Sequence, residues 1–134
     1  FWPALGSALA GPVVVKLASE IRRLAFWAGE LEKTFARRGL SVAIVGEAGN
    51  GILRAAADGH VTPETWAQEI VAPLREGLAG EGGSLVVERA PVELKRTVDV
   101  WGPVPEPSLT VMKRLKAEFD PRGILNRGRF VGGL

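Results

Sequence analysis

The feature that most constrains the fold of this chain is the order in which short strand-like runs and helical stripes alternate along it. Two helical segments with apolar stripes, one from Ile21 to Phe35 and one beginning at Thr62, separate the strand-like runs. The order is strand, helix, strand, strand, helix, strand, which predicts an α+β, ferredoxin-like βαββαβ fold with a four-stranded antiparallel sheet. The predicted strands are Val13–Leu17, Ser41–Gly46, Ile52–Ala57 and Ser84–Arg89.

Turn and cap residues mark the boundaries of these elements. Asn50-Gly51, between the second and third strands, is a strong hairpin signal. Thr62 followed by Pro63 predicts the start of the second helix, because a proline at the first helical position sacrifices no hydrogen bond. Pro73 lies inside the apolar pattern of that helix and predicts a kink or a split there.

A C-terminal extension follows the predicted sheet. It contains a short helix between Pro91 and Val100, a proline-rich connector and a third helix, for which Ser108 is the expected N-cap. Beyond that helix the chain is an irregular tail rich in glycine. The apolar stripe of the third helix is expected to face inward and consists of Leu109, Met112, Leu115 and Phe119.

These elements define the expected domain organisation. Residues 1–12 are predicted to be a linker, and residues 13–134 to be one domain, which a chain of 134 residues can support with a core of its own. Within it, residues 13–90 form the ferredoxin-like core and residues 91–134 the C-terminal extension. Both helices must bury their stripes on one sheet face, so the other face must meet water, a partner or another domain.

Composition excludes several classes of protein. Charged residues make up 24% of the chain and the net charge is +2, so the sequence carries no strong nucleic-acid footprint. The chain has no cysteine and a single histidine, and we therefore expect no disulfide and no metal site. No apolar run reaches the about 18 residues that span a bilayer. Nothing resembles a secretory signal, so the cytoplasm is the expected location.

Alternation within the strands brings two cations to the sheet face that the helices leave open. If Val15 and Leu17 face the helices, Lys16 faces the open side, and the same reasoning places Arg54 there. A guanidinium binds carboxylates bidentately, so Lys16 and Arg54 are candidate substrate-binding residues. The alternative interpretation is that Lys16 and Arg54 are ordinary solvent-facing charges. Glu47 and Glu88 are the strand carboxylates that can pair with them.

The last third of the chain carries motifs that resemble a known family. These motifs are Trp101-Gly102-Pro103, Phe119-Asp120-Pro121, Gly123-Ile124-Leu125-Asn126 and Phe130-Val131-Gly132-Gly133. They resemble the C-terminal end of the FAD-binding subunit of bacterial glycolate oxidase, one of the FAD-linked oxidases of the vanillyl-alcohol-oxidase type. The turn Ala48-Gly49-Asn50-Gly51 is similar to the matching turn in that subunit.

The resemblance implies a flavin-dependent oxidoreductase that oxidises a 2-hydroxy acid such as glycolate, with this chain as the C-terminal cap domain. FAD would be the cofactor of the full-length protein. The expected partners are an N-terminal FAD-binding half, whose glycine-rich phosphate-binding sequence this chain lacks, and further oxidase subunits that include an iron–sulfur subunit. The isolated chain is then expected to be inactive and to bind no FAD.

The resemblance also carries over three cofactor-binding candidates in the tail. They are Asn126, Gly128 and Arg129: a glycine allows close approach to a ring, and an arginine can bond an anionic flavin or a carboxylate. A solvated surface tail is the alternative interpretation. The sequence departs from the family at Arg127, where a proline is usual, and at Glu47, where the turn often carries histidine. No residue is assigned as catalytic.

Two other functions share the predicted strand order. RNA-binding domains of this topology stack bases on aromatic side chains of their central strands, and Val13–Leu17 and Ile52–Ala57 contain none. A ferredoxin-like domain that senses a small molecule or regulates an enzyme, without catalysis of its own, remains the alternative, because this fold hosts many functions.

Overall fold

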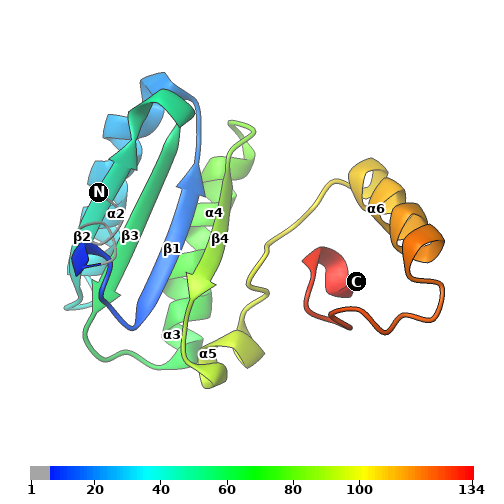
Figure 1. Cartoon of the computed structure of the whole chain (residues 1–134). Helices are drawn as coiled ribbons and strands as arrows, with labels where there is room; N and C mark the ends of the chain where they lie inside the picture. Colours follow the sequence, from blue (N-terminus) through cyan, green and yellow to red (C-terminus); the bar gives the residue numbers. More distant parts are fainter. Residues whose placement is uncertain (1–6) are drawn as a thin grey trace. The chain divides into compact units, whose positions relative to one another are not determined.

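Four strands pair into one antiparallel sheet in the computed structural model, which describes residues 7–134 (Figure 1). The order across the sheet is β2-β3-β1-β4, as in a ferredoxin-like fold, and it confirms the α+β prediction. The first six residues of the predicted linker lie outside the described residues. The strands are β1 (Val13–Ala18), β2 (Ser41–Glu47), β3 (Ile52–Asp58) and β4 (Ser84–Arg89).

Helices α2 and α4 lie on one side of this sheet (Figure 1). The core forms between them and the sheet because the inward residues of the strands and the helix stripes are both apolar. Burying each large side chain contributes about 1.5–3 kcal/mol. The most buried members of the core are Val15, Leu17, Leu31, Phe35, Ile70, Val71, Leu78 and Leu85. The helical segments are η1 (Ile21–Arg23), α2 (Leu24–Ala36), α3 (Pro63–Thr65), η3 (Trp66–Val71) and α4 (Ala72–Ala79).

The second helical segment begins as the sequence predicts and changes its winding before Pro73. Thr62 caps it, since its hydroxyl oxygen accepts the N–H of Thr65 at 3.2 Å. The turn before Pro73 is a wider π-helical turn, in which the Ala72 N–H donates to the oxygen of Ala67, five residues back. A wider turn relieves the clash between the proline ring and the preceding turn without breaking the helix.

Residues that follow β4 in the sequence make further contacts along this edge strand of the sheet. Along β4 the Val87 N–H donates to the Val100 oxygen at 2.8 Å, beyond the short helix α5 (Val92–Thr97). Arg75 from α4 donates to the oxygens of Leu85 and Val100 at 3.0 and 3.3 Å. Residues up to Val100 therefore belong with the sheet, and the boundary of this compact unit lies ten residues after the predicted end of the core.

The second compact unit spans Trp101–Leu134 and contains α6 (Glu106–Phe119) and η4 (Val131–Gly133). The expected cap at Ser108 is wrong, because the helix begins at Glu106, with Pro105 as its N-cap. The prediction that the apolar stripe of this helix faces inward is also wrong in part, since Leu115 is 53% exposed and Phe119 is 80% exposed. None of the helices within residues 7–134 is long and apolar enough to cross a membrane.

Candidate functional site

A row of four side chains crosses the middle of the open face, the side of the sheet away from α2 and α4. Register pairs Val45 with Arg54, Arg54 with Lys16, and Lys16 with Val86. The alternate residues of β1 and β3, among them Val15 and Leu17, join the core under the helices. The predicted placement of Lys16 and Arg54 on one face is therefore confirmed, and the structure brings the two cations directly opposite each other.

Two carboxylates neutralise these cations and complete a charge cluster of Lys16, Arg54, Glu47 and Glu88. Arg54 Nε donates to Glu88 Oε2 at 3.1 Å, and Arg54 Nη1 pairs with Glu47 Oε1. Lys16 Nζ lies 3.7 Å from Glu88 Oε1. A hydrogen bond from Asn50, and to a lesser extent one from Arg54, holds the pKa of Glu47 below its usual value. The expectation that these glutamates pair with the cations is confirmed, and the cluster has no net charge.

A β-bulge lies beside this cluster, at Glu88 and Arg89 of β4. Val15 lies opposite Val87, but the next residue of β1, Val14, lies opposite Arg89, so Glu88 is an extra residue in β4. Bulges of this kind re-aim side chains and occur often beside functional sites. Strand alternation alone does not reveal the bulge, because it depends on the register between two strands.

Leu9 covers one end of the open face. It is 7% exposed and packs with Val14 and Ala56, against which Val45 also lies. Arg89, the second residue of the bulge, donates from Nη1 to the Leu9 oxygen at 2.9 Å and fixes this segment. The open face is thus apolar and covered at this end, and the charge cluster lies beyond the part that Leu9 covers.

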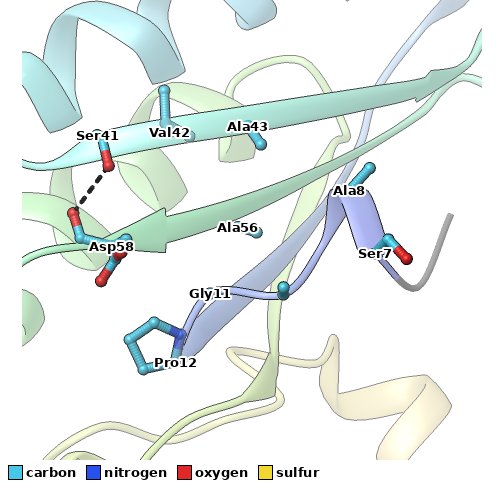
Figure 2. A pocket seen from close by; sticks show the side chains of 10 residues that line it. Ser7, Ala8, Gly11, Pro12, Ser41, Val42, Ala43, Ala56 and Asp58 are labelled. Atoms are coloured by element: carbon cyan, nitrogen blue, oxygen red, sulfur yellow. Dashed lines mark hydrogen bonds between the residues drawn. The ribbon is translucent and has the colours of Figure 1, made fainter. Parts of the chain in front are cut away.

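Beyond Leu9, a hollow opens between the N-terminal segment and the ends of β2 and β3 (Figure 2). Its polar groups are few: Ser41 Oγ donates to the Asp58 backbone oxygen at 3.4 Å, and the Asp58 carboxylate accepts the Gly59 N–H. Small side chains form most of the remaining wall, so the hollow offers no cation to an acid and no row of donors to a phosphate. The residues around it are Ser7, Ala8, Ala10, Gly11, Pro12, Ser41, Val42, Ala43, Ala56 and Asp58.

The three tail candidates lie in the second unit and share one tight turn. Asn126 adopts a left-handed φ of 48°, which asparagine tolerates better than most residues, and its oxygen accepts the Arg129 N–H at 3.0 Å. Gly128 has a φ of 70°, and a side chain added there would meet no atom within 4 Å. The side chain of Arg129 is exposed and makes no hydrogen bond or ion pair within residues 7–134.

Asp120 anchors the start of this tail. Its carboxylate oxygens accept the backbone N–H groups of Ile124 and Leu125, both at 3.0 Å, and pair with Lys116 Nζ at 2.6 Å. Lys116 and the two backbone donors hold the pKa of Asp120 at about 2. A buried, ionised aspartate therefore fixes the turn that leads into the candidate residues.

The segment that contains α6 and most of this tail is also the part that matches a protein family model. Residues 103–130 match the family model of the FAD linked oxidases, C-terminal domain. The match supports an FAD-linked oxidase C-terminal domain, and hence part of a flavin-dependent oxidoreductase, but it does not identify a substrate. It lies within the second unit and includes no residue of the sheet. No curated protein matches the chain.

The described residues do not form a complete FAD site. Gly128 has a left-handed φ of 70°, which favours glycine, and a side chain added there would meet only open space, so no described atom encloses a ring at this position. No phosphate loop accompanies it within residues 7–134, because the Gly49–Gly51 turn leads into β3 rather than a helix. Among the same residues, no three His, Cys, Asp or Glu side chains cluster to hold a metal ion.

Proposed function

We propose that this chain is the C-terminal cap domain of a flavin-dependent oxidoreductase that oxidises a 2-hydroxy acid such as glycolate. The match of residues 103–130 to the FAD-linked oxidases carries the proposal. The charge cluster supports the choice of substrate, because a 2-hydroxy acid presents a carboxylate and Arg54 is the central cation of the open face. FAD would supply the two-electron redox chemistry.

The residues of this chain would bind and orient the substrate. Arg54 Nη2 makes no hydrogen bond within residues 7–134, while Nε and Nη1 hold the two glutamates, so the guanidinium keeps donors for a carboxylate. Lys16, directly opposite, would add positive charge beside the bound acid. Arg129 would contact the flavin from the tail. Glu47 and Glu88 serve as counter-ions, and neither is proposed as the catalytic base.

The remaining partners belong to the same proposal. A polypeptide segment that binds the pyrophosphate and adenosine of FAD would complete the cofactor site. An iron–sulfur subunit would accept electrons from the reduced flavin, in the cytoplasm. In this proposal the chain needs both of them for turnover.

The decisive experiment mixes the complete flavoprotein that contains this chain with glycolate in the absence of oxygen. Glycolate should bleach the absorption of the oxidised flavin, whereas acetate, which lacks the hydroxyl group, should not. Arg54→Gln should weaken the apparent affinity for glycolate and leave the flavin content unchanged. A complete protein that binds 2-hydroxy acids and carries no flavin would overturn the proposal and favour a sensing domain.

A further inference from the structure

Lys16 and Arg54 present an unusual arrangement of like charges. They are direct cross-strand partners on β1 and β3, where like charges destabilise a sheet. The two glutamates offset this repulsion by bringing the charge of the cluster to zero. A ligand that merely adds to this cluster would add an uncompensated negative charge, so an acid binds best if it replaces a carboxylate that is already there.

The two glutamates are not held equally. Glu88 contacts both cations, one with each carboxylate oxygen. Glu47 contacts one cation, Arg54, from the last position of β2 before the turn, and its other oxygen accepts a long 3.4 Å bond from Asn50. The two carboxylate side chains are about equally exposed, at 36% for Glu47 and 32% for Glu88. Displacing Glu47 would therefore remove a partner from one cation, whereas displacing Glu88 would remove a partner from both.

We propose that Glu47 is a displaceable internal counter-ion, and that a small monocarboxylate takes its place on Arg54 when it binds the open face. This deepens the proposed function and rests on it for the identity of the acid. The exchange replaces one carboxylate on Arg54 with another, so Arg54 is never left without a partner and Glu47 moves into water. Leaving a partly buried charge unpaired is the costly alternative, and the exchange avoids it.

The surroundings of the cluster define the class of ligand. Val45 and Val86 flank the two cations along the row. On one side of the row, Leu9 covers the open face where it packs with Val14 and Ala56. A ligand on the two cations would lie between these apolar side chains, which suits a short acid. Glu88 stays in place beside Arg54, so a second carboxylate on the ligand would face it and be repelled. The site is therefore selective for short acids with one carboxylate.

Nuclear magnetic resonance titration of the 134-residue chain with glycolate tests the exchange without any flavin. Removing the competing carboxylate in Glu47→Gln should tighten glycolate binding about two- to fivefold, the strength expected of an exposed ion pair. Glu69→Gln is the matched control, because it removes a surface carboxylate from Arg38 on the helix side and should leave binding unchanged. Arg54→Gln should abolish the saturable shifts, and glycolamide, which has no charge, should produce none.

A second measurement uses the unmodified chain and does not depend on the folding of a variant. Saturating glycolate should raise the pKa of Glu47, because the displaced side chain loses its hydrogen bonds from Asn50 and Arg54. The chemical shift of the Glu47 carboxylate carbon, measured as a function of pH, follows this pKa. Glycolate that binds while the pKa of Glu47 stays low, or Glu47→Gln binding that is unchanged or weaker, overturns the exchange. Failure of glycolate to reduce the flavin of the complete protein overturns only the proposed function, since these binding measurements involve no flavin.

Discussion

Trp101 donates its indole N–H to the backbone oxygen of Arg129, 28 residues further along the chain, at a distance of 3.2 Å. The ring also meets Phe130 edge-on, with 5.7 Å between centroids. The tail of the second unit is thus fixed through its backbone at Arg129, which leaves the arginine side chain free to extend. A structural contact and a candidate cofactor contact therefore share one residue without competing for the same atoms.

Trp101→Phe should loosen the tail. The substitution keeps an aromatic ring beside Phe130 and removes the indole donor, so amide hydrogen exchange should become faster in residues 126–134. Exchange measured by mass spectrometry checks this. Trp27→Phe provides the control, because it removes the indole bond to Glu81 in the first unit and should leave exchange in the tail unchanged. Equal protection of the tail in Trp101→Phe and the unmodified chain would refute this anchor.

Asp120 should make the order of the tail depend on acidic pH. Its pKa is depressed to about 2 in the folded chain, against about 3.9 when unfolded, so its stabilisation is fully present above about pH 4 and is lost as the pH falls towards 2. Asp120→Asn keeps the shape and should remove this dependence. The amide signals of Ile124 and Leu125, followed by nuclear magnetic resonance between pH 2 and 5, report the change. A titration of the same amplitude in Asp120→Asn would contradict the assignment.

Two helix glycines should respond in opposite directions to alanine. A methyl group at Gly29 in α2 meets no atom within 4 Å, so Gly29→Ala should stabilise the chain by about 0.5–1 kcal/mol through lower unfolded-state entropy. A methyl group at Gly77 in α4 would lie 2.8 Å from Cη2 of buried Trp27, and Gly77→Ala should destabilise by about 1–3 kcal/mol. Urea unfolding measures both. The same sign for the two variants would contradict the packing of Trp27 against α4.

Most of the sheet could be predicted because its signals are local. The predicted and observed bounds of Ser84–Arg89 agree, and the first strand extends one residue further, to Ala18. Asn50-Gly51 and Thr62 also specify backbone conformations through their own chemistry, whatever surrounds them. The position of Lys16 and Arg54 on one face follows from the same local alternation.

What the sequence did not reveal depends on contacts between distant residues. Leu9 looked like part of a linker, because a single apolar residue has no periodicity, and the Arg89 side chain that fixes it lies 80 residues away. The bulge at Glu88 is a property of two paired strands, and neither strand shows it alone. The inward stripe of α6 was wrong at Leu115 and Phe119 because periodicity finds an apolar face and cannot tell what covers it.

In the flavoprotein of which we propose this chain to be a part, Arg129→Ala should lower turnover far more than it lowers thermal stability. The structure holds Arg129 through its backbone N–H to Asn126 and its oxygen to Trp101, and alanine preserves both bonds. The exposed guanidinium contributes no hydrogen bond or ion pair within residues 7–134, so its removal should leave the melting temperature nearly unchanged.

Arg127→Ala is the matched control, since it removes an equally exposed arginine two residues away. Turnover with glycolate and flavin occupancy should be measured together for both variants. If Arg129→Ala matches Arg127→Ala in both, Arg129 contacts neither the flavin nor the substrate, and only the role of its backbone in the tail remains.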